Sequence, residues 1–173
     1  MQEAATSRSR TPEPTRLDGE AVRAHLAHRP PFLFVDAAEI DVDGARARAR
    51  HVFTADQAFF EGHFPGDPIV PGVLLVEFVA QTANLLLSHR AGRAVRGWLV
   101  GVDETRFNRP VHPDREVTAD VRFARDPADA GDGAAGAGAA GDRPGGGIVA
   151  FRGTVTLDGK RCLRAAVNIY RGD

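Results

Sequence analysis

The stretch FFEGHFPGDPIVPGVLLVEFVAQTANLLLS, residues 59–88, decides the fold of this chain. It begins with a loop that is rich in glycine and proline and contains one histidine, His63. An apolar run follows, and residues 73–87 contain neither glycine nor proline, so they predict a helix. Apolar side chains cover most of its circumference instead of one stripe, which predicts a helix buried on nearly all sides.

The few polar residues of this predicted helix form one narrow line. At about 100° per residue, the line contains Glu77, Gln81, Asn84 and Ser88, which lie within roughly 60° of each other. A buried glutamate is costly unless it is paired or neutral, so Glu77 is either a hydrogen-bonded structural residue or an acid whose pKa is raised by burial. The same polar residues argue against a membrane span, although residues 69–87 are nearly long enough to cross a bilayer.

Length and composition predict a single domain. The chain has 173 residues, enough for one hydrophobic core, and its net charge of −1 provides no overall attraction to nucleic acid or to an anionic membrane. The one cysteine, Cys162, excludes an internal disulfide and favours a reduced, cytoplasmic setting. Residues 1–16 are polar and lack an apolar signal-peptide core, so we expect a disordered tail there and a single domain over residues 17–173.

The rest of the chain predicts a short helix over residues 19–26 and about six strands. The strands are expected at residues 32–42, 45–53, 97–107, 116–125, 148–157 and 161–170. Asp-Gly pairs at 43–44 and 158–159 predict two hairpins. No strand–helix–strand alternation appears, so we assign the α+β class, with a mostly antiparallel sheet around the one long helix.

Two further segments allow a functional reading: a phosphate-binding loop within residues 126–147, which we reject, and contact of the arginine row at residues 45–50 with an acidic partner, for which a solvated face is the favoured alternative. Residues 126–147 are a low-complexity mixture of Ala, Gly and Asp, which predicts a flexible loop between two strands. Within it, residues 136–141 match G-x-G-x-x-G by letter, but no strand leads directly into them and no amphipathic helix follows, so the context of a phosphate-binding loop is missing. In residues 45–50 alanine alternates with arginine, which predicts a half-buried strand with a solvated arginine face.

Three segments resemble the signature of the FabZ-type β-hydroxyacyl-[acyl-carrier-protein] dehydratases. They are HRPPFLFVD (28–36), FFEGHFPGDPIVPGVLLVEFVAQ (59–81) and GVDETRFNRPVHPD (101–114), in the order of the family and at its approximate spacing. The middle segment is the most specific, because a glutamate follows a histidine by fourteen residues with Pro-Gly between them. The resemblance covers about residues 17–170 and implies the hotdog fold, an antiparallel sheet of about six strands wrapped around one long central helix.

The chain departs from the family pattern at a few positions. Ala27 and Ala58 stand where proline is usual, Glu61 stands where glutamine is common, and the loop at 126–147 is longer than the usual tight connection. None of these changes touches His63 or Glu77, so they leave the acid–base chemistry intact and bear on substrate choice.

The resemblance implies dehydration of a (3R)-hydroxyacyl thioester on acyl carrier protein to the trans-2-enoyl thioester, in fatty-acid or related polyketide or polyene biosynthesis. His63 is then the base at C2, and Glu77 is the acid that protonates the departing C3 hydroxyl. Backbone N–H groups at Gly72 and Val73 would stabilise charge on the thioester oxygen, and Gln81 would orient the Glu77 carboxyl. No metal or other cofactor is expected, because elimination needs no electron carrier and two ligands do not make a zinc site.

Two sets of residues are candidates for contacts with the acyl chain and its carrier. We expect an apolar tunnel lined by Phe59, Phe60, Ile69, Val70, Trp98 and Phe107, and ordinary core packing is the alternative for these residues. We expect an acidic carrier protein to contact a basic patch of Arg90, Arg93, Arg96, Arg106 and Arg109, and solvated surface arginines are the alternative.

The resemblance also implies a homodimer, with trimers of dimers as a further assembly, and sites that take His63 from one chain and Glu77 from the other. Neither a nucleic-acid partner nor a membrane span is expected. Two other functions are the alternatives: a hotdog acyl thioesterase, and a non-catalytic hotdog subunit that binds acyl carriers. The intact His63 and Glu77 argue against both. An isomerising relative of the FabA type is also disfavoured, because such relatives usually have aspartate at position 77 and cysteine at position 73, where this chain has Glu77 and Val73.

Overall fold

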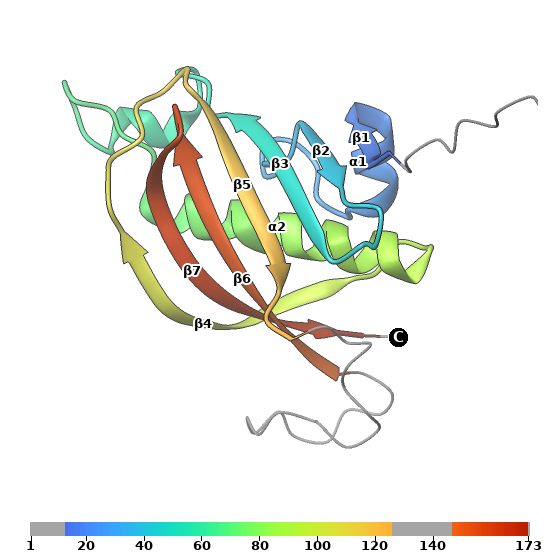
Figure 1. Ribbon diagram of the computed structural model, residues 1–173. Coiled ribbons are helices and arrows are strands. Elements are labelled where there is room, and N and C mark those ends of the chain that lie inside the picture. Colours follow the sequence, from blue (N-terminus) through green and yellow to red (C-terminus); the bar gives the residue numbers. More distant parts are fainter. Residues whose placement is uncertain (1–12, 126–146, 173) are drawn as a thin grey trace, which may run out of the picture.

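The computed structural model describes residues 13–125 and 147–172, which form one antiparallel sheet and three helical segments (Figure 1). The seven strands are β1 (Thr15–Asp18), β2 (Ala37–Ile40), β3 (Arg46–Val52), β4 (Gly97–Phe107), β5 (Glu116–Phe123), β6 (Gly147–Leu157) and β7 (Lys160–Arg171). Their order in the sheet is β1-β2-β3-β5-β6-β7-β4. The helical segments are α1 (Gly19–His25), the 3₁₀ helix η1 (Ala58–Glu61) and α2 (Gly72–Ala91).

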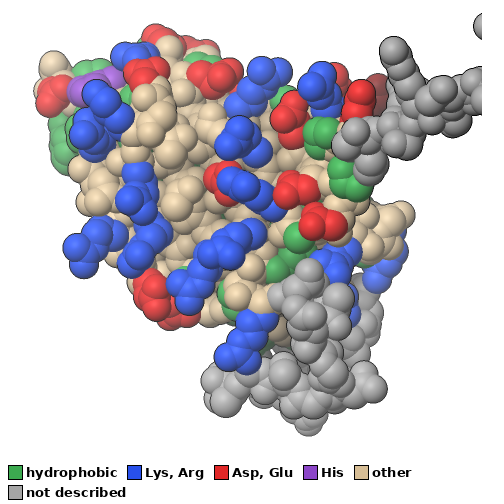
Figure 2. All heavy atoms as spheres, viewed as in Figure 1, with side chains coloured by type: hydrophobic (Ala, Val, Ile, Leu, Met, Phe, Trp, Pro, Cys, Tyr) green, Lys and Arg blue, Asp and Glu red, His purple; other side chains and the backbone are tan. Residues whose placement is uncertain are grey.

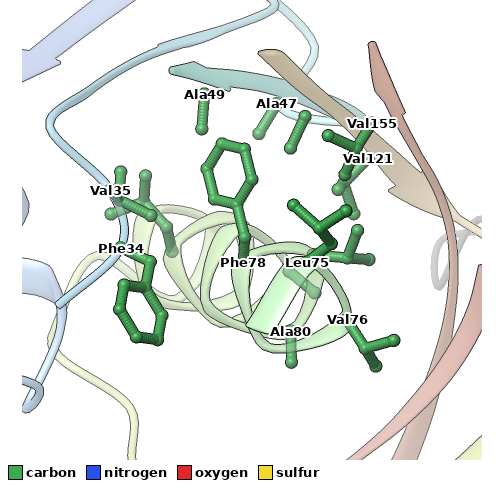
Figure 3. Close-up of a cluster of buried hydrophobic side chains, with 14 of the residues drawn as sticks. Phe34, Val35, Ala47, Ala49, Leu75, Val76, Phe78, Ala80, Val121 and Val155 are labelled. Atoms are coloured by element: carbon green, nitrogen blue, oxygen red, sulfur yellow. The ribbon is translucent and has the colours of Figure 1, made fainter. Parts of the chain in front are cut away.

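Helix α2 lies along the concave side of the sheet, and the strands curve around it (Figure 1). Phe78 points from α2 toward Ala47 and Ala49 of β3, as Figure 3 shows. The contact with β6 is so close that a Cβ atom added to Gly153 would lie 2.4 Å from Cγ1 of Val79. The helix is long and apolar enough to cross a membrane, but 72% of its most apolar 18-residue window is buried inside the protein, which is typical of a core helix.

The polar line on α2 joins the helix to two irregular segments. Gln81 accepts a hydrogen bond from the Phe34 N–H at 2.8 Å and donates one to the Phe32 carbonyl at 3.0 Å. Farther along, Asn84 donates to the Val95 carbonyl at 3.1 Å, and the Ser88 hydroxyl accepts the Val95 N–H at 3.0 Å. These side chains therefore satisfy backbone groups that no strand partner reaches.

The central helix, the short helix and the α+β antiparallel architecture are confirmed, with changes at the boundaries. Helix α2 begins at Gly72 and ends at Ala91, where Gly92 adopts a φ of 63°. The strand predicted over residues 32–42 forms only at 37–40, because the Gln81 amide takes the hydrogen-bonding groups of residues 32 and 34 that a neighbouring strand would otherwise take.

The sheet has seven strands, not about six, because Thr15–Asp18 forms the edge strand β1 beside β2. Its four residues bury one side chain, Leu17, so they carry no alternating pattern that predicts a strand. Thr15 and Arg16 thus belong to the sheet, although we expected a tail through residue 16. The remaining part of that tail up to residue 12, and the loop predicted at 126–147 except for residue 147, lie outside the described residues.

Both predicted hairpins are confirmed. Strands β2 and β3 pair, as do β6 and β7, where Asp158 and Gly159 adopt φ values of 49° and 72°. Two consecutive positive φ values are typical of the type I′ turn, which matches the twist of the flanking strands. The arginines of β3 face outward while Ala47 and Ala49 are buried, and Figure 2 shows Lys and Arg side chains spread over this outer face with Asp and Glu between them.

An Asp–His pair joins the start of β2 to the end of β3. His51 is buried among Phe34, Phe53 and Phe78, and its Nδ1 lies 3.1 Å from Oδ1 of Asp36. The other Asp36 oxygen accepts the Val52 N–H at 3.1 Å. Burial acts to raise the pKa of Asp36, but the hydrogen bond and charge of His51 and the Val52 N–H outweigh it, so the pKa lies below the ordinary value.

We expect Asp36→Asn to lower the free energy of unfolding near neutral pH, because the carboxylate loses its interactions with His51 and Val52. The pKa of Asp36 is lower in the folded state than in the unfolded state, so this stabilisation is fully present above the unfolded pKa of about 4 and is lost as pH falls through the folded pKa. Urea unfolding from about pH 6 to about pH 3 should therefore show the difference between wild type and variant shrinking. Asp18→Asn is the control, because the Asp18 side chain caps nothing; a difference that stays constant with pH would contradict this account.

Candidate active site

His63 is held in the loop between η1 and α2 by hydrogen bonds of its own backbone and ring. Its N–H donates to the Phe59 carbonyl at 3.0 Å, and its carbonyl accepts the Ile69 N–H at 3.0 Å. The ring Nδ1 lies 2.9 Å from the Ile69 carbonyl oxygen. Because a carbonyl oxygen can only accept, Nδ1 carries a proton, so in the neutral ring it is Nε2 that has the lone pair that a general base needs.

An open pocket adjoins His63 at the start of α2. It is lined by His63, by the first residues of α2, Gly72 and Val73, and by apolar side chains that include Ile69 and Phe107. The first N–H groups of a helix have no acceptor within it, and Pro71, the N-cap residue, makes no side-chain cap. The pocket therefore combines a histidine ring with uncapped backbone donors at the positive end of a helix dipole.

Gly72 lies directly beneath the ring of Phe107. A Cβ atom at position 72 would lie 2.7 Å from Cε1 of that ring, closer than side chains pack. We expected glycine here to let the substrate approach the backbone; in the structure it is Phe107 that makes the close approach. Phe107 itself is 54% exposed, so it covers the helix start from the solvent side.

Glu77 lies one turn along α2 from Val73 and faces the segment that precedes β2. The Gln81 amide nitrogen donates to Oε1 of Glu77 at 2.9 Å. Nε2 of His28 lies 3.5 Å from the same oxygen. Glu77 is not among the residues that line the His63 pocket, so a single chain does not gather the two predicted catalytic side chains around one pocket.

His28 is the residue near the site that our sequence reasoning missed. It is the first residue of HRPPFLFVD, a segment that we used only to establish the resemblance. Nothing in its local pattern indicates that it reaches Glu77, because the contact depends on how residues 26–36 fold back onto α2. The one available signal was the polar line on the helix, which requires partners from some other segment.

The predicted tunnel residues are only partly gathered. Ile69, Val70 and Phe107 line the His63 pocket. Phe60 is buried in the core and Phe59 packs against it, with their ring centroids 4.5 Å apart. These two phenylalanines are therefore ordinary core residues, which is the alternative given for them from the sequence. Trp98 lies at the opposite end of β4 from Phe107 and packs on Tyr170, with 5.9 Å between ring centroids.

The five arginines that we expected to form one basic patch are divided between two places. Arg109 lines the His63 pocket, and Arg106 lies near it at the end of β4. Arg90, Arg93 and Arg96 lie at or beyond the other end of α2, and a 20-residue helix is about 30 Å long. Arg90 lies over the ring of Phe123 at 5.1 Å. The prediction that all five arginines form one continuous patch on a single chain is therefore wrong.

Groups of His, Cys, Asp and Glu large enough to hold a metal ion, with three or more members, do not occur within residues 13–125 and 147–172.

We expect Gln81→Leu to lower the free energy of unfolding by about 2–4 kcal/mol, because it leaves the Phe34 N–H and the Phe32 carbonyl without a partner. Thr82→Val is the matched control. It removes one hydrogen bond from the neighbouring, fully buried residue, but that bond goes to the Phe78 carbonyl within the same helix, so the loss should stay below about 1 kcal/mol. Urea unfolding at one protein concentration measures both variants, and equal losses would show that the amide of Gln81 has no special role.

The chain is similar to known proteins over most of its length. The model of the FabA-like domain matches residues 26–143. The chain is 33% identical over 164 residues to the 3-hydroxyacyl-[acyl-carrier-protein] dehydratase FabZ of Cronobacter sakazakii, an alignment that covers 93% of this chain and 97% of that protein. It is 44% identical over 112 residues to the protein of the same name from Rhizorhabdus wittichii, which covers 63% of this chain and 71% of that one.

Solved structures confirm the hotdog fold. The dehydratase heterocomplex ApeI:P from Xenorhabdus doucetiae superposes with a TM-score of 0.64 at 16% identity, covering 88% of this chain and 91% of that one. A putative thioesterase from Ralstonia eutropha, related to phenylacetic acid degradation, superposes with a TM-score of 0.52 at 15% identity, covering 76% and 80%. At such identities these neighbours establish the fold alone. The family model and the curated relatives establish more: the chain belongs to the FabZ family of 3-hydroxyacyl-[acyl-carrier-protein] dehydratases.

Proposed function

We propose that this chain removes water from a (3R)-hydroxyacyl thioester on acyl carrier protein and forms the trans-2-enoyl thioester, as a cytoplasmic enzyme of fatty-acid biosynthesis. Membership of the FabZ family supports the reaction class. The observation that carries the proposal is the geometry of His63, whose Nδ1–H donates to the Ile69 carbonyl, so that in the neutral ring Nε2 has the free lone pair beside an open pocket.

In the proposed reaction, Nε2 of His63 takes a proton from C2 of the substrate. The electron pair of that C–H bond forms the C2–C3 double bond, and the C3–O bond breaks. Glu77 donates its proton to the departing hydroxyl, which leaves as water. The N–H groups of Gly72 and Val73 stabilise the negative charge that develops on the thioester oxygen in between.

We propose that a second copy of the chain completes each site, with His63 from one subunit and Glu77 from the other. The His63 pocket does not include Glu77, and two apolar residues beside it, Val73 and Phe107, are 70% and 54% exposed. Strand β4 lies at an edge of the sheet and exposes Trp98, Leu99, Val100 and Val102. An exposed, apolar edge strand favours pairing with another strand, so β4 to β4 pairing of two subunits would cover it. We place trimers of dimers after this dimer as a further level of assembly.

Turnover of 3-hydroxyacyl-carrier-protein substrates of several chain lengths, followed by the absorbance of the enoyl thioester, tests the reaction. We expect His63→Ala and Glu77→Gln each to lower kcat by about 100-fold or more, because each removes one of the two proton-transfer groups. Glutamine at position 77 keeps an oxygen that can accept the hydrogen bond from Gln81, so this variant should fold normally. His25→Gln, on α1, is the control and should retain activity. Release of free thiol in place of an enoyl product would refute dehydration and favour a thioesterase.

Mixing the two inactive variants tests the shared site. In a heterodimer of His63→Ala and Glu77→Gln subunits, one site loses both groups and the other retains both. Random association of equal amounts makes about half of the dimers mixed, so activity should return to about a quarter of the wild-type value. Activity that stays at the level of the single variants, although mixed dimers form, would place both groups within one chain.

A further inference from the structure

The two oxygens of the Glu77 carboxyl are in different surroundings. The Gln81 amide fixes this difference, because all three of its interactions are assigned by chemistry. Its oxygen accepts from the Phe34 N–H at 2.8 Å, and its nitrogen donates to the Phe32 carbonyl at 3.0 Å. The second amide hydrogen therefore points at Oε1 of Glu77, 2.9 Å away.

A donor that is directed at Oε1 settles where the carboxyl proton sits when Glu77 is neutral. The carbonyl-type oxygen of a carboxylic acid is the better acceptor, so it faces the Gln81 amide. The proton then resides on Oε2. Glu77 thus donates through Oε2 and is held through Oε1.

His28 faces the same oxygen from a second direction. Its Nε2 lies 3.5 Å from Oε1 of Glu77, which is longer than a direct hydrogen bond and within the range of an electrostatic contact. Such contacts around catalytic groups are often long in unliganded enzymes and shorten when substrate binds. In the described part of the chain, His28 is the one ionisable residue within ion-pair distance of the Glu77 carboxyl.

The backbone around His28 is held in place by its neighbour. Arg29 directs its guanidinium to the carbonyls of Leu26 and His28, both at 2.7 Å, and to that of Arg23 at 3.2 Å. The His28 ring therefore projects from a braced segment. Its other nitrogen, Nδ1, is buried and has no hydrogen-bond partner. A proton on Nδ1 would leave a buried donor unpaired, whereas a proton on Nε2 points at a carboxyl oxygen, so we assign the proton to Nε2.

We propose that His28 is a positioning residue for the dehydration: together with Gln81 it holds Oε1 of Glu77, so that Oε2 presents the proton to the departing hydroxyl. The proposal rests on the proposed function, in which Glu77 is the acid. It assigns a role in the reaction to HRPPFLFVD, a segment that lies before β2 and far in sequence from the helix that carries Glu77.

Two variants of His28 separate positioning from packing. His28→Gln keeps an N–H donor at a similar reach, and His28→Met fills similar space without a donor. We expect His28→Met to lower kcat by about tenfold or more with KM within about twofold of wild type, and His28→Gln to stay within about threefold of wild type. His25→Gln is again the control. A kcat for His28→Met within twofold of wild type would overturn the proposal, as would equal losses in both variants, since equal losses indicate packing.

If His28→Met does not fold, a polar pair answers the same question. Asparagine at position 28 keeps an amide but is too short to reach Glu77, so His28→Asn should lose activity and His28→Gln should retain it. Equal activity of these two variants would overturn the proposal.

A carbon-13 spectrum tests the contact without substrate. In glutamate-labelled protein, the carboxyl signal of Glu77 is identified by its absence in Glu77→Gln. At one fixed pH, His28→Met should move this signal, because the carboxyl loses a nearby donor, and His28→Gln should leave it in place. An unmoved signal in His28→Met would overturn the proposal. If the wild-type protein performs no dehydration, the proposed function fails, while this spectrum still decides whether His28 acts on Glu77.

Discussion

The buried amide of Gln81 is the interaction on which both the fold and the site depend. It is only 1% exposed, and all of its hydrogen-bonding groups have partners. An amide without partners in such a position would cost several kcal/mol, so residues 32–34 must lie where they do whenever α2 is packed under the sheet. The same amide holds the Glu77 carboxyl, so the proposed acid is fixed directly to the rigid core.

The start of α2, in contrast, leaves backbone N–H groups without a side-chain partner. Serine, threonine, aspartate or asparagine at the N-cap would satisfy free N–H groups and stabilise the helix, but this chain has Pro71 there, without a side-chain cap. The uncapped donors at Gly72 and Val73 open onto the pocket beside His63. The helix therefore lacks the stabilisation that a cap would supply. Its N–H groups stay free at the place where the proposed reaction needs donors for a developing negative charge.

The two ends of α2 differ in what surrounds them. Around the middle and the C-terminal half the side chains are buried, and Asn84 and Ser88 satisfy the backbone of Val95. At the N-terminal end Val73 and Phe107, the last residue of the edge strand β4, remain exposed beside the pocket. In the proposed dimer this exposed apolar surface becomes the place where two chains share a site, so assembly and catalysis depend on the same residues.

The sequence by itself determined the local features that follow from side-chain pattern. A run without glycine or proline predicted the buried helix, the Asp-Gly pairs predicted the hairpins, and the alternating Ala and Arg residues predicted which face of β3 is buried. The spacing of His63 and Glu77, with Pro-Gly between them, identified the family. These features depend on neighbouring residues and on helix or strand periodicity, which a single sequence contains.

Only the tertiary structure decided what lies opposite each of those residues. The contact of His28 with Glu77, the irregular path of residues 32–36, and the place of Thr15–Asp18 as an edge strand all depend on segments that are far apart in the chain. The division of the five arginines between two ends of the molecule likewise follows from the length and direction of α2. Local pattern contains no information on such partners, because a side chain meets them only after the sheet has curved around the helix.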